Sequence, residues 1–305
     1  MPIRKVLKQG DDYLGIPCGN QKSIYKHMKR ITGVLLAILC WSCQEEVTLP
    51  LGEKEELVPT IEGYWTDQSV FNEVRLTLSK DYYDSLEVTV IDDAQVSITV
   101  ASSGRVIPFI FLQGSGLYRP ANPQDRAIVG ESYQLNVKWK DNVYASEGLM
   151  LQPPKVDSVT WSYEEERVFR DEGYYIKVYG QIPFTEDNNY RIKVIENDTL
   201  KNGREDYLLF DDTFGLQFFE EGLELGYAFE ENDKVRLELF RLNRNAFEYL
   251  NQLVNLLYND GGLFSPPPQN PDTNITVIQG APEVLGYFVV TPVLTQTVII
   301  TNEDD

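Results

Sequence analysis

Ser132-Tyr-Gln-Leu-Asn-Val-Lys-Trp139 places an aromatic or aliphatic residue at every second position. Successive side chains of a β-strand point to opposite faces of a sheet, so this alternation predicts a strand with one face in a core. The same period recurs at Val74/Leu76/Leu78 and at Val96/Ile98/Val100. Repetition of a half-buried strand pattern predicts an antiparallel, mostly β architecture.

Turn-forming residues separate these strands at short intervals. Their spacing is typical of a sandwich, and we therefore expect an immunoglobulin-like β-sandwich over residues 58–152. The turn segments are Asp92-Asp93, Ser102-Ser103-Gly104, Gly114-Ser115-Gly116 and Asp141-Asn142.

Pro153-Pro154 marks the predicted end of the sandwich. Two consecutive prolines fix the backbone and remove two amide donors, which favours a stiff connection between domains. Beyond them the strand period returns, and we expect a second antiparallel β domain over residues 153–305. Its clearest strands are Tyr174/Ile176/Val178, Tyr190/Ile192/Val194 and Val235/Leu237/Leu239.

One helix is predicted within this second domain, near residues 244–258. Phe247, Leu250, Val254 and Leu257 recur at steps of three and four, which places them on one face of an amphipathic helix. Asn243 or Asn245 can cap its first turn, because an asparagine side chain accepts hydrogen bonds from free amides there. The predicted fold is therefore mostly β with a single amphipathic helix.

Residues 28–42 have the pattern of a bacterial lipoprotein signal peptide. Two basic residues follow Met28, a short apolar run comes next, and small Ser42 precedes Cys43. We expect cleavage before Cys43 and acylation of its thiol. Residues 1–27 are interpreted as a misannotated upstream extension, and residues 43–57 as an acidic tether. Contact with membrane lipid would then be through acylated Cys43.

The composition restricts the chemistry that a protein starting at Cys43 could perform. His27, Cys18 and Cys40 all precede the predicted cleavage site, so no imidazole or further thiol would remain for a Ser-His-Asp triad or a zinc site. The chain has 27 Lys+Arg and 47 Asp+Glu, of which seven and two lie in residues 1–42, leaving a net charge of −25. This charge disfavours nucleic-acid binding.

Adjacent carboxylates are frequent, and side chains of this kind have three possible uses. A carboxylate pair can hydrolyse glycosides, but neighbouring residues of a strand point to opposite faces. Structural calcium, which takes oxygen ligands from loops, stays an alternative, although no loop of the EF-hand type is present. We therefore expect turn and surface roles, with no catalytic residue, no metal ligand and no cofactor. The groups are Asp92-Asp93, Glu164-Glu165-Glu166, Asp211-Asp212, Glu220-Glu221 and Glu230-Glu231 with Asp233.

Two features are candidate contact surfaces. Tyr174-Tyr175 lies in a strand pattern, so one ring is expected in the core and the other outside. Phe264 precedes Pro266, Pro267 and Pro268, and a rigid proline loop loses little entropy when it docks. This loop is the candidate interface, and a structural clasp between the helix and the last strands is the alternative.

Several short segments, in order along nearly the whole chain from Cys43 onward, resemble a family of Bacteroidota outer-membrane lipoproteins grouped as domain of unknown function 4249. Members are commonly encoded beside TonB-dependent receptors. The resemblance implies an accessory to such a receptor in nutrient binding or uptake, with a small-molecule, glycan or peptide ligand. The segments are Pro59 to Asp67, Val74 to Ser79, Gly116 to Pro120, Gly130 to Leu135, Tyr144 to Ser146, Phe264 to Ile275 and Leu285 to Phe288.

Gln44, Glu45 and Glu46 follow the predicted lipidation site and resemble the export signal of these lipoproteins. The resemblance implies a lipid-anchored protein on the outer face of the outer membrane. Two other functions stay open: a structural or adhesive surface protein, and a carboxylate-dependent glycoside hydrolase.

Overall fold

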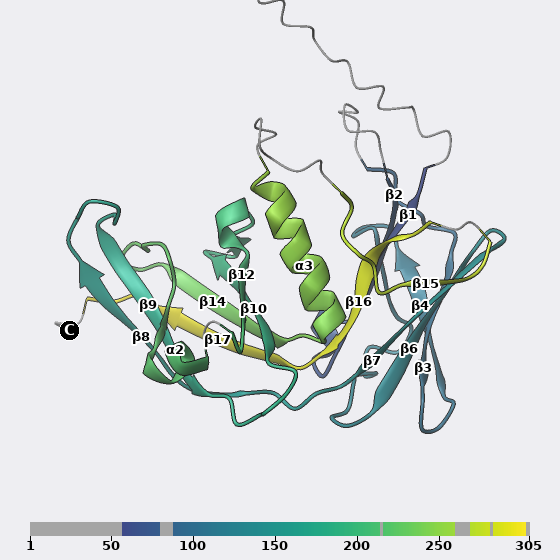
Figure 1. The fold of residues 1–305 in the computed structure, drawn as a ribbon, viewed down its shortest axis with the longest axis horizontal. Coiled ribbons are helices and arrows are strands. Elements are labelled where there is room, and N and C mark those ends of the chain that lie inside the picture. Colours follow the sequence, from purple (N-terminus) through teal and green to yellow (C-terminus); the bar gives the residue numbers. More distant parts are fainter. Residues whose placement is uncertain (1–56, 80–87, 214–215, 260–268, 281–282, 303–305) are drawn as a thin grey trace, which may run out of the picture. The chain divides into compact units, whose positions relative to one another are not determined.

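The computed structural model describes residues 57–79, 88–213, 216–259, 269–280 and 283–302. Strands dominate these residues, and one helix is longer than two turns (Figure 1). The mostly β fold class with one amphipathic helix is confirmed. No helix among the described residues is long and apolar enough to cross a bilayer.

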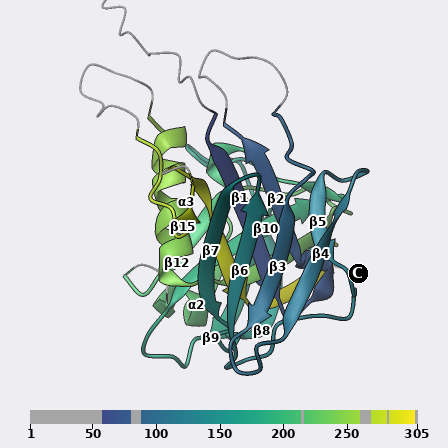
Figure 2. The same ribbon diagram turned by 90° about the vertical axis from the view of Figure 1, so that its right-hand side faces the viewer.

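The first sheet has nine strands in the order β15-β7-β6-β3-β4-β5-β2-β1-β16. Strand β4 pairs with β3 on one side and with β5 on the other, so it joins the two halves of a sandwich-like layer pair (Figure 2). Its strands are β1 (Pro59–Thr66), β2 (Glu73–Leu78), β3 (Gln95–Val100), β4 (Val106–Leu112), β5 (Leu117–Pro120), β6 (Ser132–Trp139), β7 (Asn142–Leu149), β15 (Thr276–Gln279) and β16 (Leu285–Thr291).

The predicted alternation places the core of this sheet correctly. Tyr133, Leu135 and Val137 of β6 are buried in one cluster with Trp65 of β1 and Ile98 of β3. Burying a side chain of this size contributes roughly 1.5–3 kcal/mol, so these few positions carry much of the stability of the sheet.

Two smaller sheets follow. One has the order β11-β10-β14-β17, with β12 also paired to β10, and the other has the order β13-β9-β8. Their apolar faces share a second core that includes Ile176, Ile192 and Leu237. The elements are β8 (Lys155–Glu164), β9 (Gly173–Gln181), β10 (Asn189–Glu196), β11 (Thr199–Leu200), β12 (Leu208–Asp211), α2 (Leu216–Glu221), β13 (Leu223–Glu224), β14 (Lys234–Arg241) and β17 (Val293–Ile299), with 3₁₀ turns η1 (Ser69–Phe71) and η2 (Arg204–Asp206).

Helix α3 (Arg244–Leu257) begins after Asn243, whose side chain accepts a hydrogen bond from the amide of Ala246 at 2.9 Å. Of the two predicted caps, Asn243 is therefore the one used. The apolar face of α3 buries Phe247 and Leu250 in a third cluster with Phe240 of β14 and other residues. This cluster also contains Val289 of β16, so the helix packs on strands of both larger sheets.

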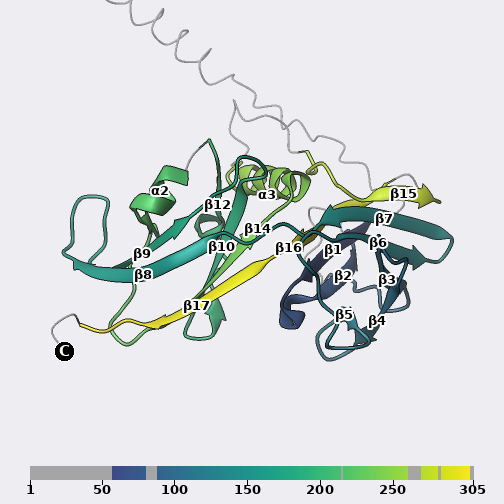
Figure 3. The ribbon, with the colours of Figure 1, turned by 90° about the horizontal axis from the view of Figure 1, so that it is seen from below.

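The chain passes directly from the nine-stranded sheet into the next one at Pro292 (Figure 3). Strand β16 pairs in parallel with β1, and β17 then pairs antiparallel with β14. Two strands of the first sheet, β15 and β16, thus lie far beyond Pro153 in the sequence. The domain boundary placed at residue 153 stays a prediction.

Gly286 permits the close approach of β16 to β1. Its φ is +100°, and a Cβ added there would lie 2.0 Å from the carbonyl oxygen of Ile61. Only glycine adopts this conformation at low cost, and the opposing atom belongs to the backbone and cannot move aside.

We predict that Gly286→Ala lowers the free energy of unfolding by about 3 kcal/mol, because it adds backbone strain to a steric clash. Thermal melting of the full chain measures the loss. Gly226→Ala is the matched control, since nothing lies within 4 Å of a Cβ there. Equal melting temperatures for the two variants would show that the parallel pairing does not depend on glycine.

Candidate functional site

The hairpin that joins β8 to β9 ends in two exposed apolar residues. Arg167 and Arg170 exchange backbone hydrogen bonds of 2.9 and 3.0 Å, which leaves Val168 and Phe169 as the turn. Val168 is 82% exposed and Phe169 is fully exposed. Phe169 also has a φ of +70°, a left-handed conformation that costs a residue with a side chain roughly 1 kcal/mol.

Side chains on both strands hold this turn in place. Arg170 pairs with Glu224 at 2.9 Å and lies 3.8 Å over the ring of Tyr175. Arg167 pairs with Glu164 at 3.1 Å. The turn is therefore supported by contacts that leave Val168 and Phe169 themselves uncovered.

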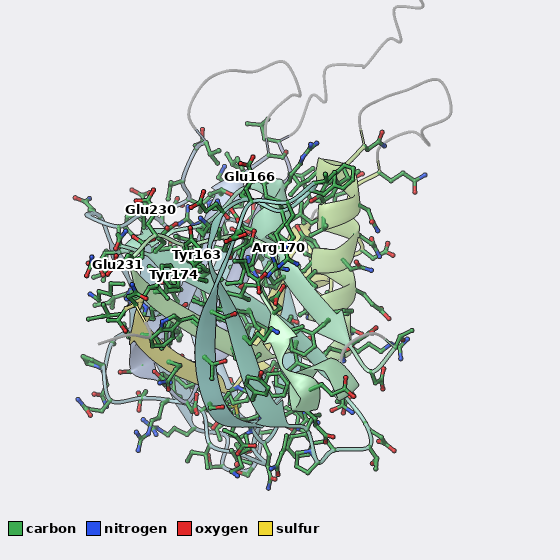
Figure 4. The ribbon with its side chains drawn as sticks, turned by 90° about the vertical axis from the view of Figure 1, so that its left-hand side faces the viewer. Tyr163, Glu166, Arg170, Tyr174, Glu230 and Glu231 are labelled. Atoms are coloured by element: carbon green, nitrogen blue, oxygen red, sulfur yellow. The ribbon has the colours of Figure 1, made fainter. Side chains whose placement is uncertain are left out.

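A second set of contacts lies just behind the turn. The rings of Tyr163 and Tyr174 pack edge to face with centroids 5.3 Å apart, and Figure 4 shows them side by side on the paired strands. The hydroxyl of Tyr163 hydrogen-bonds Glu172, and this bond raises the pKa of Tyr163 above its ordinary value. Cross-strand aromatic pairs of this kind stiffen a hairpin.

Acidic residues flank the apolar turn in the sequence. Both arginines of the turn are paired with carboxylates, so the unpaired charge around Val168 and Phe169 is negative. Glu166, labelled in Figure 4, is one of these exposed acids. The exposed acidic residues nearest in sequence are Glu165, Glu166, Asp171 and Glu172. We call Val168, Phe169 and these four acids the hairpin tip.

The expectation that one ring of Tyr174-Tyr175 would be exposed is wrong. Tyr174 and Tyr175 are only 7% and 4% exposed. Tyr174 belongs to the second core. Tyr175 points the other way, but the guanidinium of Arg170 covers its ring and its hydroxyl donates to the carbonyl of Asp171 at 3.0 Å.

A separate feature is a cavity of about 310 Å³ between the two smaller sheets. Its floor is apolar and buried, formed by Val178, Ile192, Leu237 and Leu239. At its mouth the cavity is lined by exposed Lys155, Thr295 and Gln296. The volume is at the lower end of the range for small-molecule sites, and the lining suits an apolar group with a polar end at the mouth.

The predicted carboxylate groups lie mainly at turns and on the surface. Asp92, Asp93, Glu230 and Glu231 are exposed, and Figure 4 shows the last two at the molecular edge. Asp233 is buried, and it accepts hydrogen bonds from Asn197 and from the amide of Glu230, both at 2.7 Å. Burial alone would raise the pKa of Asp233, but these bonds outweigh it and lower the pKa. Asp233 is thus a turn-stabilising residue.

Within the residues that the structure describes, no three Asp, Glu, His or Cys side chains gather in an arrangement that could hold a metal ion. The predicted lipidation site Cys43, the export residues Gln44, Glu45 and Glu46, and the interface residues Phe264, Pro266, Pro267 and Pro268 lie outside the described residues. They stay predictions.

Sequence reasoning missed both the hairpin tip and the cavity. Val168 and Phe169 follow three glutamates and give no periodic signal, although two apolar residues between arginines in a polar turn are unusual enough to find. The four residues of the cavity floor were predicted only as core positions of strands. The cavity forms where paired strands diverge, and local sequence patterns do not encode how strands pair.

A family model described as "Domain of unknown function (DUF4249)" matches residues 44–297 of the chain. A search of curated proteins found no match.

We predict that the full chain in detergent binds the apolar fluorophore 1-aminoanthracene saturably in this cavity. Val159→Trp should weaken that binding by about tenfold or more, because Val159 lines the cavity and is partly exposed, so the larger ring can occupy the space. Fluorescence titration measures the change. Val106→Trp on exposed β4 is the control, and equal affinity in the two variants would remove the cavity as the binding site.

Proposed function

The chain belongs to the DUF4249 family, and from that premise we propose that it is a lipid-anchored accessory protein of an outer-membrane TonB-dependent receptor. It acts in nutrient binding or uptake by contact rather than by catalysis. Its anchor is acylated Cys43, and it faces the cell exterior. The location and the receptor follow from the family resemblance of the sequence.

The hairpin tip is the observation that carries this proposal. An exposed aromatic side chain on a supported turn loses little conformational freedom on docking, and aromatic residues dominate the energy of many interfaces. The fold gains no packing from Val168 or Phe169, since both lie in solvent. A partner protein would provide the burial that the chain itself does not.

The charge around the tip specifies the chemistry of that partner. Exposed acids flank the two apolar residues along the chain, so a complementary surface is an apolar socket with a basic rim. The receptor is proposed to present this socket at its outer mouth. Anchoring both proteins in one membrane raises their effective concentration, so a small contact is sufficient.

The apolar cavity supports the nutrient-binding part of the proposal. A ligand with a small apolar body fits its buried floor, and a polar group fits the exposed Lys155 and Gln296 at its mouth. The cavity would hold such a ligand near the receptor before transfer.

The lipid anchor gives the first prediction here. Cys43→Ala should release the protein from the membrane fraction, because the acylated thiol is the proposed attachment. Cys40→Ala, three residues upstream, should leave attachment unchanged. Fractionation followed by immunoblotting distinguishes them, and a membrane-bound Cys43→Ala protein would rule out this anchor.

The proposed receptor contact gives the second prediction. Phe169→Asp should reduce the receptor recovered with the tagged protein from mildly solubilised outer membrane at least tenfold, because it places a charge in the apolar contact. Ile128→Asp, at another exposed apolar position, is the matched control. Quantitative mass spectrometry measures recovery.

Equal recovery by the two variants would show that the tip is not the contact. Recovery of an adhesion protein in place of a receptor would instead support the structural or adhesive function.

A further inference from the structure

Strand β10 carries two cations on the face opposite the cavity. Arg191 and Lys193 alternate with Ile192, whose side chain lines the cavity floor. On this face the cross-strand neighbours of Arg191 are Leu209 of β12 and Phe240 of β14. Those two residues pack in the cluster around α3, and Figure 1 shows α3 running beside β10 and β16.

Arg191 is deeply buried with its hydrogen-bonding capacity only partly used. Its side chain is 8% exposed, and its Nε atom has no hydrogen-bond partner. Its Nη1 atom lies 3.4 Å from the hydroxyl of Tyr64, and its guanidinium lies 4.8 Å from the ring centre of Tyr207. A buried guanidinium with an unpaired donor can bind a further acceptor.

Lys193 is directed to the same place. Its ammonium lies 4.7 Å from the ring centre of Tyr64 and 4.9 Å from that of Phe240. These cation–π contacts offset part of its desolvation, but an aromatic face has no net charge. Tyr64 therefore lies between two positive groups.

No carboxylate of the described residues forms an ion pair within 4 Å of either cation. Glu238 faces Lys193 across the strands, but it pairs with Arg236 at 3.1 Å. Glu62 shares a strand face with Tyr64 and still makes no ion pair with Arg191 or Lys193. The chain has a net charge of −20, yet no acid of the described residues lies within ion-pair distance of these two cations.

Tyrosine hydroxyls occupy the position where an acid would be expected. The hydroxyls of Tyr64 and Tyr287 are 2.5 Å apart. Burial would raise the pKa of Tyr64, but Lys193 and Arg191 outweigh it and lower the pKa, whereas burial raises that of Tyr287. The two cations thus favour negative charge here, and neutral hydroxyls cannot supply it.

We propose that Arg191 and Lys193 bind the oxyanion of a ligand, a carboxylate or phosphate group, with the hydroxyl of Tyr64 as an additional donor. Arginine suits this role because its planar donors match the two oxygens of such a group. Tyr64, Lys193 and Tyr207 retain partial exposure, so a ligand would approach past these three side chains. This site does not depend on the proposed receptor contact.

Calorimetry of the full-length protein in non-ionic detergent tests the site with inorganic phosphate and with acetate at constant ionic strength. We expect saturable binding of at least one probe, weakened at least tenfold by Lys193→Gln and by Arg191→Gln. Lys138→Gln, at an exposed strand position, should bind as the unchanged protein does. Lys193 is only partly buried, so its variant keeps the test valid if Arg191→Gln does not fold. Absence of saturable binding, or equal affinity in all variants, would overturn the site.

Tyr64 could itself supply the negative charge next to the two cations, if its hydroxyl were ionised to tyrosinate. Tyrosinate absorbs near 295 nm, and comparison with Tyr64→Phe at pH 7.5 isolates the signal of this residue. We expect no Tyr64-dependent tyrosinate absorbance in the absence of phosphate and acetate. A full tyrosinate signal would mean that Tyr64 is the permanent counter-ion of the two cations, and would overturn the proposal.

Discussion

One stretch of backbone, residues 285–299, belongs to two sheets, and the rest of the described fold is arranged about that constraint. At the joint Thr291 is fully buried and donates its hydroxyl hydrogen to the carbonyl of Arg241 at 2.8 Å. Arg241 is itself buried and donates to three backbone carbonyls, including that of Gln152 just before Pro153. Burial lowers the pKa of Arg241. Three directed acceptors offset the desolvation of its charge. This one side chain thus links the end of β14 to the segment that leads from β7 into β8 and to the segment that precedes β10.

The sheet that contains β10 and β14 has different chemistry on its two faces. Ile192 of β10 faces the apolar cavity, whereas Arg191 and Lys193, its neighbours, face the tyrosines of β1 and β16. Strand β14 repeats the division, with Leu239 in the cavity and Phe240 under α3. Because side chains alternate along a strand, one sheet presents an apolar and a cationic surface without either disturbing the other. A single small ligand cannot occupy both, since the backbone of the sheet lies between them.

Local pattern predicted what depends on local geometry. The alternation in Ser132–Trp139 gave the strand and its buried face, and the apolar spacing from Phe247 to Leu257 gave the helix. The pairing of strands was not predictable. Strands β1 and β16 are more than 200 residues apart, and the residue pattern of neither strand identifies the strand that it pairs with. Arg191 shows why the sequence did not predict the proposed oxyanion site. A charged residue alternating with apolar ones indicates a solvent face, yet here that face is covered by a helix and by strands from the other sheet.

The residues of the β8–β9 turn are difficult to explain by folding alone. A two-residue turn is most easily formed by asparagine and glycine, which adopt left-handed backbone at little cost. Valine and phenylalanine instead add strain at Phe169 and leave two large apolar side chains in water. The flanking ion pairs and the Tyr163–Tyr174 contact then support a conformation that the turn residues themselves do not favour. Replacing the turn with residues that favour a left-handed backbone would remove this strain. Burial of Phe169 against another molecule would offset the cost, which favours the contact proposed above.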